Sequence, residues 1–462
     1  MAELHALPDR DRQGYLKEVK QTLLLAGPVI GSQLGQMSMG FVDTVMVGRL
    51  GVEALAGVAL GNTIFFVLVI VTMGVILAVS PMVSQAHGSE DEAAIEISVR
   101  EGLRMGLVLS VIPFLILWNI KPLLLWMGQV PETVELTSSY LRAIAWGILP
   151  FLWFGAIRSL VEGVSRPLPV TLITFFALGL NALANYVLMF GKWGFPALGL
   201  EGTGWASSIV YWTMFIVIAT YSRVSTVFRK YKIFSNLGKM DVPAFKEVFK
   251  VGWPIGISHG IEAGLFSITA LTMGLLGTVS LAAHQVAIQC AAYTFMVPMG
   301  IGIAASVRVG QSVGMENHLG AQQAGYVAIM LSTIFMSFTA ILFWVFPRFF
   351  IGLYIDTALA ENLEVVKLAT VLLSVAAIFQ VFDGIQVAAL GALRGLKDTR
   401  VPMIIGFISY WLIGLTVGMS LAFYFEKGAI GLWWGLVLGL AAAAVLLSLR
   451  FRHSTNRAVQ TF

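Results

Sequence analysis

The sequence carries very little charge for its length. Of 462 residues only 12% are Asp, Glu, Lys or Arg, about half the share of an ordinary soluble domain, whereas 58% are hydrophobic. So few charges cannot cover a surface that faces water. The composition therefore excludes an ordinary soluble protein and indicates that lipid covers much of the surface.

Cysteine and two common motifs are also scarce or missing. Cys290 is the single cysteine, which excludes an intramolecular disulfide and a cysteine-based metal cluster. The sequence has no His-Glu-x-x-His zinc motif and no phosphate-binding P-loop. These absences argue against a membrane-embedded zinc enzyme and an ATP-driven pump, and we expect a protein that is not an enzyme.

The start of the sequence shows no sign of a cleavable signal peptide. Met1–Lys20 is polar and charged, without an apolar core before a small-residue cleavage site. About 22 of the 29 Lys and Arg residues fall on the side that holds both termini, which the positive-inside rule makes cytoplasmic. The most basic segment is Arg223–Lys250, which we interpret as a topology anchor; a patch for lipid or nucleic acid is the alternative.

Long apolar runs recur along the chain. Thr22–Phe41, Ile64–Val83 and Met105–Leu125 each approach the roughly 20 residues that cross a bilayer as a helix. The sequence predicts twelve spans, centred near residues 35, 68, 113, 147, 180, 211, 263, 296, 334, 377, 412 and 439. We therefore expect an all-α polytopic membrane protein.

The chain also repeats itself at long range. A gapless shift of 226 residues superimposes many identical residues between Pro28 and Gly88 and their counterparts. The superimposed pairs include Pro28 on Pro254, Gly51 on Gly277, Met73-Gly74 on Met299-Gly300 and Gln85 on Gln311. A register held over this length indicates two halves of related structure.

Each half holds six predicted spans, so the chain returns to its starting side before the second half begins. The two halves are then parallel repeats, related by an axis along the membrane normal. The sequence predicts lobes at residues 1–222 and 246–462, joined by a basic cytoplasmic connector at residues 223–245. We expect two pseudo-symmetric six-helix bundles around a central cavity, the architecture of an alternating-access carrier.

Three acidic residues fall inside the predicted spans: Asp43, Glu262 and Asp383. A charge at the bilayer centre costs at least about 2.5 kcal/mol, so these acids are functional candidates. Under the repeat shift, Glu262 falls on Gln36 and Asp43 falls on Thr269, so the acids are not symmetry copies. The difference indicates unlike duties in the two halves. The structural alternative is a protonated acid that joins neighbouring helices by hydrogen bonds.

Glu262 and Asp383 both belong to the second half and are expected to meet in one bundle. Two neighbouring carboxylates can hold a hard monovalent cation such as Na⁺, or they can share protons. Either use makes them part of an ion-driven cycle, because binding a cation removes their mutual repulsion.

Further polar residues lie at membrane depth. Asn181 and Asn185 are one turn apart on the fifth predicted span and share a face, and Ser207 lies on the sixth. Together with Asp43 they predict a small polar site, with ordinary hydrogen bonding between helices as the alternative. Arg394, after the tenth span, is interpreted as a charge anchor, with a gate role as the alternative.

Several stretches carry a resemblance to a known family. They are residues 40–48, 282–287, 304–310 and 393–398. Their order and spacing over the twelve predicted spans resemble the multidrug and toxic compound extrusion transporters, in their bacterial NorM-like branch, over essentially the full length. Each stretch alone is modest, and the order of all four makes the match specific.

The resemblance implies a secondary active antiporter of the bacterial inner membrane that exports small organic cations, such as drugs and dyes, in exchange for H⁺ or Na⁺. Such export confers antibiotic resistance. We expect a monomer surrounded by membrane lipid, with both termini cytoplasmic, no nucleic-acid partner and no cofactor besides the coupling ion.

The resemblance also implies residue roles. Asp43 matches the acid of the amino-terminal lobe that is associated with protonation and substrate release. Asn181, Asn185 and Ser207 match the polar residues around it. The acids of the carboxy-terminal lobe that are implicated in cation binding are matched by Glu262 and Asp383.

One position departs from the family pattern. A Na⁺-binding relative has a tyrosine four residues before the second acid, where this chain has Phe379. The missing phenolic oxygen favours H⁺ over Na⁺ as the coupling ion. A lipid or lipid-linked precursor flippase of a related fold is the alternative function, although it would favour a cationic rather than an acidic site.

Overall fold

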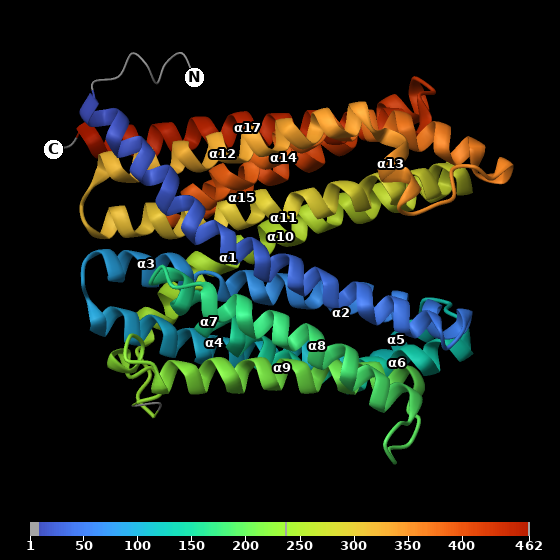
Figure 1. The fold of residues 1–462 in the computed structure, drawn as a ribbon, viewed down its shortest axis with the longest axis horizontal. Helices are drawn as coiled ribbons and strands as arrows, with labels where there is room; N and C mark the ends of the chain where they lie inside the picture. The colour runs from blue at the N-terminus through green and yellow to red at the C-terminus, as the bar shows by residue number, and fades with distance from the viewer. Residues whose placement is uncertain (1–8, 236–237, 461–462) are drawn as a thin grey trace. The chain divides into compact units, whose positions relative to one another are not determined.

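The computed structural model of the chain describes residues 9–235 and 238–460, and every regular element in these ranges is a helix (Figure 1). The helices of the first half are α1 (Asp9–Gly48), α2 (Val52–Ile76), α3 (Val79–Gly88), α4 (Glu92–Trp118), α5 (Ile120–Trp126), α6 (Pro131–Ala145), α7 (Ile148–Gly163), α8 (Leu168–Phe190) and α9 (Gly199–Val224). The predicted all-α architecture is confirmed.

A short 3₁₀ helix, η2 (Arg229–Tyr231), precedes the second half. The second half contains α10 (Val242–Leu275), α11 (Thr278–Gly314), α12 (His318–Val345), α13 (Pro347–Gly352), η3 (Ala360–Asn362), α14 (Leu363–Gly395), α15 (Arg400–Phe407), η4 (Ile408–Leu415), α16 (Thr416–Met419), η5 (Ser420–Tyr424) and α17 (Gly428–Gln460). The elements from α15 to η5 follow one another without a break, and η4 and η5 are π-helical.

Nine helical stretches of the described chain are long and apolar enough to cross a membrane, and the bent pair α6–α7 can form a tenth. The bend of 45° in this pair lies near residue 147, where the sequence predicts one continuous span. The long helices α1 and α10, which carry acidic and basic residues, fall outside this apolar set. Together these helices correspond one to one with the twelve predicted spans.

The sequence repeat is visible in the backbone. Gly51 and Gly277, which the repeat superimposes, precede α2 and α11 with φ angles of 116° and 118°. L-residues with a side chain rarely adopt this conformation, so glycine is required at both turns. Asp91 and Asn317, also superimposed, each cap a helix by accepting from the backbone N–H three residues ahead, at 2.9 and 2.8 Å.

By its internal contacts the chain forms two compact units. The N unit is Gly31–Gly256, and the C unit combines the described residues up to Ile30 with those from Ile257 onward. The repeat superimposes Gly31 on Ile257, so the two unit edges fall at the same point of each half. These edges lie inside α1 and α10, whereas the boundaries predicted from the sequence lie at the two ends of the basic connector, residues 223–245.

The connector predicted at residues 223–245 packs on the start of α4, within the N unit. Lys230 forms an ion pair with Glu92 at 2.5 Å, and the Ser235 hydroxyl donates to Glu96 at 3.0 Å. Asn236 and Leu237 lie outside the described residues, as do residues 1–8 and 461–462 of the predicted lobes and termini. Some of the connector's positive charge is therefore neutralised by acids of the N unit.

In the C unit, α11 and α14 cross at very close range, and α12, α14 and α17 run side by side (Figure 1). A Cβ atom added at Gly391 would lie 2.1 Å from the carbonyl oxygen of Gly302. Small residues allow such close approach of helix backbones in lipid. This crossing fixes α14, which carries one of the candidate acids.

Candidate functional site

In the N unit, α1 and α8 bring Asp43 to the two asparagines. The Asn185 side chain donates from Nδ2 to Asp43 Oδ1 at 2.5 Å. Asn181, one helical turn earlier on the same face of α8, also contributes a side-chain hydrogen bond to the Asp43 carboxylate. Three of the four residues predicted for this site therefore lie together.

The asparagine carbonyls of this site have spare acceptor capacity. Asn181 Oδ1 and Asn185 Oδ1 are both buried and have no hydrogen-bond partner among the described residues. Buried polar atoms normally find a partner, so each exception requires an explanation. The Asp43 site therefore offers a carboxylate and two amide carbonyl oxygens, a set suited to a cation or a protonated group.

Ser207, the fourth predicted residue, is buried on α9, but in the described part of the chain its hydroxyl makes no hydrogen bond to Asp43. Two tyrosines that the sequence reasoning missed, Tyr140 and Tyr211, lie within electrostatic range of Asp43. The Tyr140 hydroxyl donates to Asn62 Oδ1 at 2.6 Å. Their only signal in the sequence is a polar group on an apolar side chain inside a span.

In the C unit, α10 and α14 bring the other two acids to one amide group. The Nε2 atom of Gln386 donates to Glu262 Oε1 at 3.1 Å and to Asp383 Oδ1 at 3.2 Å. Gln386 follows Asp383 by three residues on α14, so both side chains leave the same face of the helix. A neutral donor thus lies between two carboxyl groups that would otherwise repel each other.

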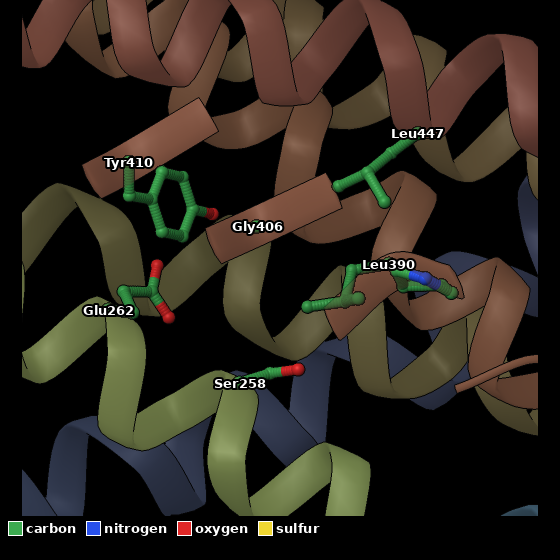
Figure 2. A pocket seen from close by; sticks show the side chains of 7 residues that line it. Ser258, Glu262, Leu390, Gly406, Tyr410 and Leu447 are labelled. Atoms are coloured by element: carbon green, nitrogen blue, oxygen red, sulfur yellow. The ribbon is translucent and has the colours of Figure 1, made fainter. Parts of the chain in front are cut away.

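Tyr410, from the π-helical η4, completes this group because its hydroxyl donates to Gln386 Oε1. Glu262 and Tyr410 also line a small cavity in the C unit, in which their side chains face each other (Figure 2). The remaining lining residues are Ser258, Leu390, Pro402, Gly406 and Leu447. The mostly apolar cavity therefore borders this group on the Glu262 and Tyr410 side, and Asp383 and Gln386 are not among its lining residues.

About two turns after Gln386 on α14, Arg394 meets α10. Its Nη2 atom lies 3.2 Å from Nε2 of His259. A guanidinium can only donate, so this nitrogen of His259 accepts and the ring is neutral. The charge of Arg394 also acts on Glu262. The interpretation of Arg394 as a charge anchor missed this inward contact with the helix of Glu262.

Comparison with known proteins identifies the family. A family model described as MatE matches residues 28–187 and again residues 254–419. The two matches begin at Pro28 and Pro254, a pair that the sequence repeat superimposes. The chain belongs to the multidrug and toxic compound extrusion (MATE) family.

Curated relatives confirm the NorM-like branch of the MATE family. The probable multidrug resistance protein NorM of Pseudomonas aeruginosa is 39% identical over 442 residues, which are 96% of this chain and 91% of the relative. The protein of the same name from Mesorhizobium japonicum is 40% identical over 439 residues, which are 95% and 94% of the two chains. The similarity therefore spans nearly the whole chain.

Solved MATE structures share the fold at lower identity. The eukaryotic MATE transporter AtDTX14 superimposes with a TM-score of 0.85 at 21% identity, over 97% of this chain and 99% of that chain. A MATE protein in complex with MaL6 gives a TM-score of 0.87 at 18% identity, over 96% and 97%. The chain is thus a multi-pass membrane protein of a bacterial transporter family, not of an enzyme family.

The chain contains two Gly-x-Ser-x-Gly pentapeptides, at residues 256–260 and 310–314, a pattern that hydrolases use for their nucleophile. Both lie inside continuous helices, α10 and α11. A hydrolase elbow needs a sharp turn between a strand and a helix. Neither pentapeptide is therefore a nucleophile elbow, and the spacing of small residues suits helix packing instead.

Phe379, the departure from the family pattern, takes part in an aromatic cluster. It is buried, and its ring contacts those of Phe266 and Trp433 at centroid distances of 6.1 and 5.7 Å. A phenolic oxygen is nevertheless present near the acids, because Tyr410 supplies one from another helix. In the described ranges no group of three or more His, Cys, Asp and Glu side chains is placed to hold a metal ion. A cation at Glu262 and Asp383 would need neutral oxygen ligands.

Proposed function

We propose that this MATE protein is an antiporter of the bacterial inner membrane that exports small organic cations in exchange for H⁺ or Na⁺. The observation that carries the proposal is the pair of acidic sites inside membrane-spanning helices, one in each unit. Burying an ionised acid at membrane depth costs free energy, so such acids are rare and usually mark a transport pathway. The named relatives are multidrug resistance proteins, which supports organic cations as the transported class.

The two sites have different duties in this proposal. Asp43, with Asn181, Asn185 and Ser207, binds the organic cation and releases it when the carboxylate is protonated. The coupling cation binds at Glu262 and Asp383. A ligand drives a conformational change only through its different affinity for the two states. Both sites change net charge on binding, so each can supply such a difference.

The remaining features of the proposal follow from the family and the charge pattern. The protein works as a monomer in contact with membrane lipid, both termini face the cytoplasm, and no cofactor besides the coupling ion is needed. The acidic character of both sites disfavours a flippase for lipid-linked pyrophosphate, which would need cationic partners. Nucleic acid has no part in this proposal, in which the basic connector serves as a topology anchor.

The test uses purified protein in liposomes, with ethidium flux followed under a pH gradient alone and then under a Na⁺ gradient alone. We expect at least one gradient to drive export, and Asp43→Asn to abolish it. Glu361→Gln, at an exposed acid in η3, is the matched control and should export at the wild-type rate. Flux with neither gradient would overturn the antiport and favour the flippase.

A further inference from the structure

The side-chain amide of Gln386 occupies the position where a coupling cation would bridge the two acids. A single nitrogen atom, Nε2, lies 3.1 Å from Glu262 Oε1 and 3.2 Å from Asp383 Oδ1. An amide nitrogen has two N–H donors, so one proton is available for each carboxyl group. The amide thus does with two partial charges what a bound cation would do with a full one.

We propose that Gln386 is a reversible ligand of the coupling cation. In the ion-free state its NH₂ group bridges Glu262 and Asp383, as in this structure. When a monovalent cation such as Na⁺ enters, the amide turns over and presents Oε1 between the same two carboxylates. This inference rests on the proposed antiport and extends it by naming a third oxygen ligand of the cation.

The chemistry of the amide permits this exchange. The terminal torsion of glutamine is broad and roughly two-fold, so a half turn exchanges the oxygen and the nitrogen without moving the rest of the side chain. Hard cations take carboxylate and amide carbonyl oxygens as ligands, and an N–H group cannot serve. Cation binding therefore requires the amide to turn or to leave, because its present orientation aims two protons at the acids.

Tyr410 determines which orientation is preferred in the ion-free protein. Its hydroxyl donates to Oε1 of Gln386, which holds the oxygen away from the acids and the nitrogen toward them. After the turn, Nε2 faces the phenolic oxygen, which can accept a hydrogen bond. The hydroxyl proton of Tyr410 then needs another acceptor, and Glu262 lines the same small cavity (Figure 2). Tyr410 therefore acts as a latch on the ion-free orientation.

The backbone around the site changes little in this exchange. Asp383 and Gln386 leave one face of α14, and α14 is fixed on α11 by the close approach of Gly391 and Gly302. A half turn of the amide therefore leaves Asp383 and the backbone of α14 in place. The small cavity borders Glu262, one of the two acids.

The test measures Na⁺ binding directly, so that it does not depend on transport. Purified protein is heated in detergent at pH 8 in NaCl or in choline chloride of equal concentration, and the unfolding midpoint is followed. A ligand that binds only the folded state raises the midpoint as its concentration exceeds its Kd. We expect a saturable increase with Na⁺ that choline does not produce.

Two variants of contacting residues should change this response in opposite directions. Gln386→Leu removes the third ligand and should raise the Kd for Na⁺ by about tenfold or more. This factor corresponds to the loss of one polar contact with a charged group. Tyr410→Phe removes the latch and should lower the Kd by about fivefold, the factor for one neutral hydrogen bond. A merely structural role of the pair would weaken Na⁺ binding in both variants and would contradict the proposal.

Gln380→Leu is the matched control, because Gln380 is another buried glutamine of α14 whose side chain bonds Thr294 instead of the acids, with Thr294 Oγ1 3.0 Å from its Oε1. It should keep the wild-type Na⁺ response. Should Gln386→Leu fail to fold, Gln386→Glu takes its place; its oxygens cannot donate when ionised, and Na⁺ should bind more tightly than in the wild type.

The outcomes separate this inference from the proposed function. Wild-type protein without a Na⁺-specific response, or Gln386→Leu with an unchanged Kd, would overturn the role of Gln386. Liposomes that export ethidium under neither gradient, while the opposite effects of the two variants hold, would overturn the antiport and leave the cation site in place.

Discussion

The acid sites of the two units differ in how completely their amide partners are satisfied. Around Asp43 the carbonyl oxygens of Asn181 and Asn185 are buried without a partner in the described chain. Around Glu262 and Asp383 the amide of Gln386 is bonded at both ends, to the acids and to Tyr410. The first site has two unused acceptor oxygens, whereas both ends of the amide in the second site are occupied.

The backbone repeat makes this difference informative. The turns at Gly51 and Gly277 and the caps at Asp91 and Asn317 agree closely between the halves. The repeat thus preserves the parts that shape helices, where φ and capping leave few choices of residue. The ionisable groups do not follow the repeat, because Glu262 falls on Gln36 and Asp43 falls on Thr269.

The largest expected effect comes from removing one acid at a time. Asp43→Asn and Asp383→Asn should each reduce ethidium export to below about a tenth of the wild-type rate, because each removes a group whose charge changes on binding. Only Asp383→Asn should also remove the Na⁺-dependent increase in the unfolding midpoint. If Asp43→Asn removed that increase as well, the division of duties between the units would be wrong.

Buried ion pairs give the next effect, in stability rather than transport. In the N unit Arg158 bonds Glu162 at 2.7 Å, with side chains 9% and 4% exposed. Glu162→Ala leaves a buried guanidinium with a lost charge partner and should cost about 3–5 kcal/mol. The measurement is the free energy of unfolding in detergent, followed by intrinsic fluorescence.

The matched change in the C unit is Glu18→Ala, opposite Arg308, where the side chains are 11% and 16% exposed. Arg308 keeps hydrogen bonds to two amides, Gln21 and Gln311, whereas Arg158 keeps one, to Gln33 at 2.8 Å, so the expected loss is smaller, about 1–3 kcal/mol. A loss equal to that of Glu162→Ala would show that the remaining amides do not compensate the guanidinium.

Helix packing is tested with two glycines. Gly391→Ala places a methyl group against the Gly302 carbonyl and should cost about 1–3 kcal/mol of stability. Gly179→Ala, on α8 of the N unit, meets no atom within 4 Å and should be neutral or stabilise by up to about 1 kcal/mol. Thermal unfolding of both variants gives the comparison, and equal destabilisation would contradict the close crossing of α11 and α14.

The smallest effect is expected at the connector. Lys230 and Glu92 have side chains 47% and 53% exposed, so water and salt screen their ion pair. Lys230→Ala should change the stability by less than about 1 kcal/mol, and the change should vanish at high ionic strength. A larger effect that persists in 1 M salt would give the connector a structural role beyond that of a charge anchor.

Much of the fold could be predicted because its causes are local. Span length and apolar content follow from the thickness of the bilayer, and the repeat follows from identity in register. Charge inside an apolar run is visible without a structure, which singled out Asp43, Glu262 and Asp383. The contact of Asp43 with Asn185 was within reach of the same reasoning, since the family resemblance pointed to both residues.

Other features depended on the tertiary structure. Gln386 had a signal in the sequence, three residues after Asp383, but its partner Tyr410 lies on a separate helix whose rotation is set by packing. The inward contact of Arg394 with His259 joins positions 135 residues apart. The bend between α6 and α7 and the unit edges inside α1 and α10 likewise arise from contacts.

The sequence by itself thus determined how many helices cross the membrane, how the halves repeat and which acids lie inside the spans. The bilayer penalises every charged residue within an apolar span, so each one stands out in the sequence. The tertiary structure decided which neutral groups face those acids. Hydrogen bonds between side chains depend on the relative rotation and distance of helices, and no local rule of the chain specifies these.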